Sequence, residues 1–156
     1  MAIEIERKYL VDAKKLSGVK FSTEEKISQG YLSSNPTVRV RLKGNRGWLT
    51  IKTSTKGITR QEFEYEIPPE DAEQLLKLCG AQVLKKYRRT LEYGGHKWEV
   101  DFFCGRHKGL ILAEVELERA DEPVELPAWI SKEVSRDPQY YNSNLVKSRR
   151  RWDGRR

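Results

Sequence analysis

Residues 3–10 read Ile3-Glu4-Ile5-Glu6-Arg7-Lys8-Tyr9-Leu10, a stretch in which apolar and charged side chains nearly alternate. Successive side chains of a β-strand point to opposite faces, so the pattern predicts a strand with one charged and one apolar face. Glu4, Glu6 and Lys8 share the charged face. Two neighbouring carboxylates repel each other, and Lys8 can offset the charge of only one of them. Such a face suits either open water or a bound metal ion.

The same alternation recurs in later segments, where the charged faces are sorted by sign. Arg39, Arg41 and Lys43 share one face of their segment, whereas Glu62 and Glu64 share one face of theirs. Glycine-rich turns beside some of these segments are typical of β-hairpins. We expect further strands over residues 26–33, 37–43, 48–53, 60–67, 83–93, 96–104 and 110–118. Such a mainly β chain with few helices favours an antiparallel barrel or sandwich.

The predicted helices are few and short. Pro69 to Leu78 has apolar residues at helical spacing, and Gly80 provides a stop signal after it. A proline opens each of the segments 127–134 and 138–146, which predicts two short helices. A single helical turn is expected within residues 12–18.

The composition predicts one domain over residues 1–156, since no repeat or linker divides the chain. There are 30 Lys and Arg against 23 Asp and Glu, which gives a net charge of +7. That excess is compatible with polyanionic partners, including phosphate compounds, nucleic acid or an acidic membrane surface. Much of it sits in residues 147–156, which we expect to form a flexible basic tail.

Few residues suit a thiolate or imidazole metal site. Cys79 and Cys104 form no C-x-x-C pair, and the chain contains only 2 His. His96 and His107 stand close to glycine turns, so we expect both to be exposed loop residues. No apolar run reaches transmembrane length and nothing resembles a signal peptide, which predicts a soluble, cytoplasmic protein.

Periodicity alone leaves open whether the charged strand faces point to water or into a shared interior. Solvated faces usually mix the two signs of charge, whereas here Arg and Glu are sorted by strand. The apolar faces also carry large aromatic residues, which helices could cover from outside. Both observations are compatible with a closed barrel that has a charged lumen.

An ordered set of short motifs resembles the CYTH superfamily, also called the triphosphate tunnel metalloenzymes. The first, E-x-E-x-K at residues 4–8, is a weak signal alone, but the set covers nearly the whole chain in the family's order. The motifs are Glu4-Ile5-Glu6-Arg7-Lys8, Val38-Arg39-Val40-Arg41, Thr50-Ile51-Lys52, Glu62-Phe63-Glu64-Tyr65-Glu66-Ile67, Lys86-Tyr87-Arg88, Glu99-Val100-Asp101, Glu114-Val115-Glu116 and Tyr140-Tyr141-Asn142. The chain looks most like the compact bacterial branch.

The resemblance implies a closed eight-stranded antiparallel β-barrel, a tunnel with its charged residues inside and outer helices against its apolar faces. It also implies the activity of that branch, the metal-dependent hydrolysis of inorganic triphosphate (tripolyphosphate) to pyrophosphate and phosphate. A triphosphate is a dense polyanion, for which Arg offers a planar fork of donors. Mg²⁺ or Mn²⁺, the implied cofactor, prefers a few carboxylates together with phosphate oxygens and water.

The implied site residues fall into three overlapping sets. The substrate-binding set is Lys8, Arg39, Arg41, Lys52, Lys86 and Arg88. The metal set has Glu114 and Glu116 first, then Glu4 and Glu6, with Asp101. The catalytic set is Glu4, Glu6, Lys8, Glu62 and Glu64, of which the last two support the metal ligands. Asp101 and Glu99 could instead hold the basic residues in place, and we favour that second role.

Other functions on the same fold stay open. They are a class IV adenylate cyclase, a thiamine, nucleoside or RNA triphosphatase, and a polyphosphate-binding module without turnover. The intact carboxylate set speaks against pure binding, because a binder needs the cations more than the glutamates. No adenine pocket can be identified, and Trp48 is the nearest candidate for stacking. We expect a small triphosphate as partner, neither membrane nor nucleic acid, and leave the oligomeric state open.

Overall fold

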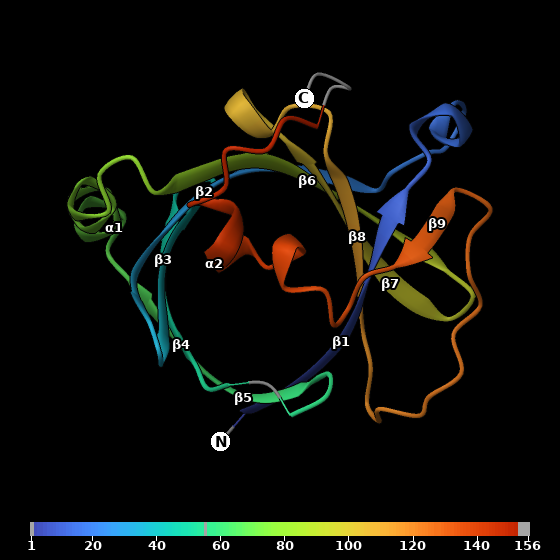
Figure 1. The fold of residues 1–156 in the computed structure, drawn as a ribbon, viewed down its shortest axis with the longest axis horizontal. Helices are drawn as coiled ribbons and strands as arrows, with labels where there is room; N and C mark the ends of the chain where they lie inside the picture. The colour runs from blue at the N-terminus through green and yellow to red at the C-terminus, as the bar shows by residue number, and fades with distance from the viewer. Residues whose placement is uncertain (1, 55, 153–156) are drawn as a thin grey trace.

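The computed structural model describes residues 2–54 and 56–152 and consists mainly of β-strands (Figure 1). The strands are β1 (Ala2–Val11), β2 (Thr23–Ser34), β3 (Thr37–Lys43), β4 (Arg46–Lys52), β5 (Thr59–Ile67), β6 (Val83–Tyr93), β7 (His96–Phe103), β8 (Ile111–Glu116) and β9 (Ile130–Glu133). The α-helices are α1 (Pro69–Leu78) and α2 (Asn142–Leu145). The 3₁₀ turns are η1 (Ala13–Leu16), η2 (Gly105–His107) and η3 (Pro138–Tyr140).

The strands β1 to β8 close into a barrel, seen as a ring in Figure 1. Their order is β5-β4-β3-β2-β6-β7-β8-β1, and β1 also pairs with β5, so these eight strands form a closed ring. Every neighbouring pair is antiparallel. The closed eight-stranded antiparallel barrel expected from the family resemblance is therefore confirmed.

The charged strand faces point into the barrel. On β3, Arg39 and Arg41 are only 6% and 8% exposed, and on β7 Asp101 is 1% exposed. Residues two apart on a strand share a face, so each motif of alternating charge delivers its charged members to the same lumen. The question that periodicity left open is thus settled in favour of a charged interior.

The segment 127–134, expected to be a helix, instead contains the ninth strand, β9 (Ile130–Glu133). It pairs antiparallel with the second half of β1, with Tyr9 opposite Glu133 and Val11 opposite Ile130. Trp129, just before it, is buried and packs edge-on against Trp98 with ring centroids 5.9 Å apart. The helix prediction was wrong because this burial and the ladder to β1 outweigh a local signal from one proline.

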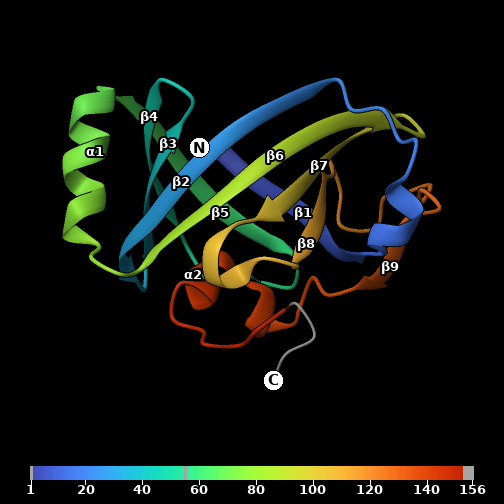
Figure 2. The same ribbon diagram turned by 90° about the horizontal axis from the view of Figure 1, so that it is seen from above.

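The helix α1 has the bounds that the sequence predicts, and it lies on the outside of the barrel beside β3 and β4 (Figures 1 and 2). The turn η1 lies within residues 12–18, as expected. The segment 138–146 is less regular than predicted, since it holds η3 and the short α2 in place of one helix. Both lie across one end of the barrel (Figures 1 and 2). None of the helices that the structure describes could cross a membrane.

Two apolar clusters hold the barrel. One lies outside the wall, where Trp98, Val100 and Val115 pack beneath the β9 segment with Tyr9 and Trp129. The other lies at the end occupied by α2, where it contains Leu84, Phe103, Leu112, Tyr140, Leu145 and Val146, with Leu10 packed against it. Leu84 and Leu112 are in phase with the lumen-facing Arg88 and Glu114, so this second cluster fills one end of the lumen.

Both histidines differ from the expectation of exposed loop residues. His96 begins β7 and bonds to the carboxylate of Glu122. His107 is 2% exposed and accepts a hydrogen bond from the indole N–H of Trp152, 3.1 Å from Nε1 to Nδ1. The turn η2 folds His107 under the C-terminal segment, a contact between distant parts of the chain that local pattern does not predict.

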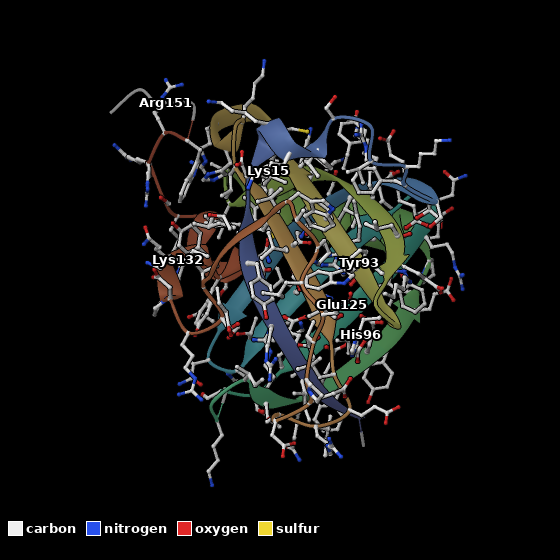
Figure 3. All side chains as sticks on the ribbon, turned by 90° about the vertical axis from the view of Figure 1, so that its right-hand side faces the viewer. Lys15, Tyr93, His96, Glu125, Lys132 and Arg151 are labelled. Carbon is white, nitrogen blue, oxygen red and sulfur yellow. The ribbon has the colours of Figure 1, made fainter. Side chains whose placement is uncertain are left out.

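Within the tail expected over residues 147–156, Trp152 packs on the protein, with its ring centroid 5.5 Å from that of Tyr140. Its neighbour Arg151 is exposed and projects away from the barrel in Figure 3. The rest of the tail, residues 153–156, lies outside the described part of the chain.

The contact between α1 and the barrel gives a stability prediction. A Cβ at Gly47 would stand 2.8 Å from the Cβ of Ala72 and 3.0 Å from the carbonyl oxygen of Ile67. An added methyl group would collide with both the helix α1 and the backbone of β5. Gly47→Ala should therefore lower the free energy of unfolding by about 1–3 kcal/mol. Urea denaturation measures this change, and an unaltered midpoint would show that α1 is not seated closely on β4.

Candidate active site

The charged lumen encloses a cavity of about 260 Å³. Every residue of the three predicted sets lines it except Lys86 and Asp101. The lining members are Glu4, Glu6, Lys8, Arg39, Arg41, Lys52, Glu62, Glu64, Arg88, Glu114 and Glu116. Strands far apart in the sequence thus bring cations and carboxylates to one chamber, because closure turns all their charged faces inward.

Arg41 is a cation of the site whose hydrogen-bond partner is an uncharged side chain. Its Nε and Nη2 donate to the side-chain oxygen of Gln29, at 3.0 and 2.7 Å, and Gln29 is fully buried on the neighbouring strand β2. Burial, together with the charges of Arg39 and Arg88, lowers the pKa of Arg41 to about 9. The guanidinium is still protonated at neutral pH, and because Gln29 carries no charge, the positive field remains available to an anion in the cavity.

Arg39 is held by a row of residues that face one another across three strands. The register places Arg39 opposite Thr50, and Thr50 opposite Glu64. Nη2 of Arg39 donates to the Thr50 hydroxyl at 3.2 Å and to Glu64 at 3.4 Å, while Thr50 donates to Glu64 at 2.9 Å. Cross-strand pairing therefore fixes the orientation of this guanidinium.

Glu6 and Glu114 form the first of two carboxylate pairs in the cavity. They come from the neighbouring strands β1 and β8, and each side chain shifts the pKa of the other. Burial and then the charge of Glu114 raise the pKa of Glu6 well above its ordinary value. Burial also opposes ionisation of Glu114, but the charges of Lys8 and Arg88 outweigh it and lower that pKa. Two carboxylates at such close range cannot both ionise without a further cation.

Glu4 and Glu62 form the second pair. Burial disfavours ionised Glu4, yet its hydrogen bond with Glu62 and the charges of Lys52 and Arg60 lower its pKa. Burial and the bond with Glu4 raise the pKa of Glu62 to about 7. Nζ of Lys52 lies 3.1 Å from Glu4 and 3.4 Å from Glu62, which joins the pair to the cationic wall.

Lys86 and Asp101 lie behind the cavity. Arg88 donates to the two oxygens of Asp101 at 2.8 and 2.9 Å, and Nζ of Lys86 is 2.6 Å from Asp101. These cations lower the pKa of Asp101 to about 2 against the effect of burial. Burial, opposed by Asp101, lowers the pKa of Lys86 to about 7. With both oxygens engaged, Asp101 holds the basic residues in place, the role favoured for it on sequence grounds.

The segment across the barrel end supplies the remaining wall. Tyr141, Asn142 and Ser143 line the cavity, and the carbonyl oxygen of Tyr140 accepts from Nζ of Lys8 at 3.2 Å. The amide oxygen of Asn142 accepts from Nζ of Lys86 at 3.3 Å. Tyr140, which the family motif includes, points instead into the apolar cluster.

Sequence reasoning did not include Arg60 and Gln29 in the site. Nε of Arg60 lies 3.0 Å from Glu4, and Arg60 lines the cavity. Its position two residues before Glu62 puts it in phase with the acidic face of β5, a signal that could have identified it. Gln29 is likewise in phase with the lumen-lining Tyr31, but its role depends on facing Arg41 across β2 and β3.

A second cavity of about 340 Å³ lies near the C-terminal end of β6 and the N-terminal end of β7. Lys43, Arg88 and Glu99 line both cavities, so the two spaces adjoin. Lys97 faces it together with Glu25 and Glu92, which makes its lining mixed in charge. Arg39, Arg41, Lys8 and Lys52 line the first cavity and are not among the residues around the second.

The carboxylate set fits a hard divalent cation. Among the described residues no three acidic, His or Cys side chains already stand together as a complete metal cage, and the carboxylates meet in pairs. Mg²⁺ commonly takes one or two carboxylates and completes its shell with substrate phosphate oxygens and water. The raised pKa values of Glu6 and Glu62 reflect burial and a neighbouring carboxylate, and a bound cation would favour the ionised form of both groups.

Comparisons with known proteins agree with this geometry. Residues 2–150 match the CYTH domain. An inorganic triphosphatase of Acetivibrio thermocellus is 42% identical over 95% of this chain and 96% of its own length. An inorganic triphosphatase of Nitrosomonas europaea is 34% identical over 93% of this chain and 97% of its own length.

A solved structure shares the architecture as well. The crystal structure of an inorganic triphosphatase superposes with a TM-score of 0.67, at 29% identity over 95% of this chain and 97% of that one. The domain match and both sequence relatives span nearly the whole chain. The protein is therefore a member of the CYTH domain family.

Proposed function

We propose that this protein hydrolyses inorganic triphosphate to pyrophosphate and phosphate with the help of Mg²⁺ or Mn²⁺. The observation that carries the proposal is one lumen cavity of about 260 Å³ in which buried cations face paired carboxylates. Such a chamber suits a small, highly charged anion that arrives with a divalent metal ion. Two relatives named as inorganic triphosphatases support the same activity. The predicted cytoplasmic location stays a prediction.

The cationic wall would bind the phosphate chain. Arg39, Arg41 and Arg88 are each at most 8% exposed, so their N–H groups act in a medium that screens charge poorly. Gln29 and Thr50 orient two of these guanidinium groups before any ligand arrives. Lys8 and Lys52 would complete the set of phosphate-binding cations. Lys86 does not line the cavity and would act indirectly, through its ion pair with Asp101, which also binds Arg88.

The carboxylates would hold the metal ion. Glu4, Glu6, Glu114 and Glu116 are the proposed ligands. When bound, the ion would neutralise the oxygens of the triphosphate and make the phosphorus more open to attack by water. Glu62 and Glu64 would act as positioning residues, because they contact Lys52 and Arg39 at 3.4 Å.

Substrate specificity should follow phosphate count. The residues described around the cavity are mostly ionic, and the aromatic rings among them are Tyr31 and Tyr141. Binding energy should therefore come almost wholly from the phosphate chain. We expect kcat/KM for inorganic triphosphate to exceed that for ATP by about tenfold or more, because a nucleoside adds bulk without matched contacts. Pyrophosphate should have a lower kcat and a higher KM than inorganic triphosphate, since it cannot reach the cations and the carboxylates at the same time.

Phosphate release from inorganic triphosphate, ATP, thiamine triphosphate and pyrophosphate at fixed Mg²⁺ tests this expectation. Cyclic AMP is measured in the ATP sample. Cyclic AMP formation with ATP as the best substrate would replace the proposal with an adenylate cyclase. Tight binding of triphosphate without turnover at any metal concentration would make the protein a binding module.

The metal set is tested by the double variant Glu114→Gln/Glu116→Gln. Amides match the volume of the carboxylates but lack the charge that a hard cation requires, so metal-dependent turnover should disappear while the barrel stays folded. The matched control is Glu70→Gln/Glu73→Gln on the exposed face of α1, which should retain full activity. Full activity in a folded Glu114→Gln/Glu116→Gln protein would exclude these residues from the metal site.

The cationic wall is tested at Arg41. Arg41→Ala should weaken triphosphate binding by about 1.5–3 kcal/mol, the scale of a hydrogen bond to a charged group. Arg41→Lys should restore only part of this, because an ammonium cannot both bond to Gln29 and offer a fork to phosphate. Arg46→Ala removes an exposed cation that pairs with Glu66 and serves as the control for net charge. Calorimetric titration with the non-cleaving Glu114→Gln/Glu116→Gln protein as background separates binding from turnover.

A further inference from the structure

The end wall of the lumen, residues 138–147, has little stability of its own. It consists of η3, with 3 residues, and α2, with 4 residues. Isolated helices far below about 12 residues are marginal in water, so the wall must be held by contacts to the rest of the protein. Its apolar side chains Tyr140, Leu145 and Val146 pack into the cluster that fills this end of the barrel.

Trp152 adds a second attachment to the outside of this wall. Its ring lies 5.5 Å from that of Tyr140, and its indole N–H donates to Nδ1 of the buried His107 at 3.1 Å. The guanidinium of Arg150 stacks over the indole at 4.1 Å and also bonds to Gln139 in η3. We call Trp152 and His107 the C-terminal latch.

The wall in turn touches two basic residues of the site. The carbonyl oxygen of Tyr140 accepts from Lys8, and the side chain of Asn142 accepts from Lys86. Lys86 and Arg88 both bind Asp101, so the position of the wall bears on that network. The CYTH domain match ends at residue 150, which leaves Trp152 outside the matched segment. His107, the other member of the latch, lies within the matched segment.

We propose that the C-terminal latch positions the end wall, and through it Lys8 and Lys86, for turnover. Trp152 and His107 are positioning residues, because neither lines the cavity. The kinetic part of the proposal rests on the proposed triphosphatase activity. A competing explanation is that the basic tail attracts the polyanionic substrate by charge alone, and the two make different predictions for neutral substitutions.

Four variants and one control separate these explanations. Trp152→Ala removes both ring and N–H, whereas Trp152→Phe keeps ring packing and loses only the hydrogen bond. His107→Leu removes the acceptor, and His107→Asn restores an acceptor near the position of Nδ1. Arg151→Ala removes an exposed charge one residue from the latch and is the control for tail electrostatics.

Amide hydrogen exchange of the full-length protein is the readout that needs no activity. Within the wall, the backbone N–H groups of Leu145 and Val146 donate hydrogen bonds to the carbonyl oxygens of Tyr141 and Asn142. In Trp152→Ala these amides should exchange about tenfold faster or more, while amides of β7 stay unchanged, because the wall opens locally. Trp152→Phe should lie between Trp152→Ala and the unaltered protein, and Arg151→Ala should match the latter.

The kinetic readout is the division between kcat and KM for inorganic triphosphate well below the unfolding temperature. Trp152→Ala should lower kcat by about tenfold with a smaller change in KM, since Arg39 and Arg41 are held by Thr50, Glu64 and Gln29, which lie on the barrel strands. His107→Asn should recover most of the kcat lost in His107→Leu. In a double-mutant cycle, Asn142→Ala should add little to Trp152→Ala, because both act through the same wall.

Each outcome bears on one claim. Unchanged amide exchange in the wall of folded Trp152→Ala would overturn the latch, whatever the activity. Faster exchange with unaltered kcat would show that the latch does not act on turnover. A loss in Arg151→Ala equal to that in Trp152→Ala would favour simple charge attraction. If the unaltered protein hydrolyses no triphosphate, the proposed function fails, while the exchange data still test the latch.

Discussion

The cost of burying charge inside a closed barrel governs this structure. A guanidinium or carboxylate removed from water needs a partner in good geometry, and here antiparallel register supplies it. Arg39, Thr50 and Glu64 face one another across three strands, and Arg88 stands opposite Asp101. A shift of one residue in any of these pairings would turn the charged face outward and leave its partners buried alone. The register that closes the barrel therefore also assembles the site.

Much of the fold could be predicted from the sequence, because alternation along a strand is a local signal. The bounds of β3, β6 and α1 follow from residues within each element. The β9 segment and His107 could not be predicted in the same way. Their states depend on Trp129 reaching Trp98 and on Trp152 reaching His107, contacts that join residues far apart in the chain.

The lining of the candidate site could be predicted to a similar extent. Phase along each strand identifies which side chains enter the lumen, and so it finds Glu4, Arg41 and Glu114. Phase does not indicate which of these charges is already neutralised by a neighbouring side chain of opposite charge. Asp101 and Lys86 share the lumen phase with their neighbours, yet they are engaged with each other and with Arg88 behind the cavity. That distinction depends on depth along the barrel and on cross-strand partners, which periodicity does not contain.

The hydrogen bonds from Arg41 to the uncharged side chain of Gln29 link the stability of the protein to its ligands. Because Gln29 orients the guanidinium without cancelling its charge, Arg41 is repelled by Arg39 and Arg88. An anion that occupies the lumen relieves this repulsion in the folded state and has no equivalent site in the unfolded chain. At a concentration a hundred times its Kd, such a ligand adds about 2.7 kcal/mol to the free energy of unfolding. If the proposed binding holds, the resistance of this barrel to heat would thus depend in part on the phosphate compounds around it.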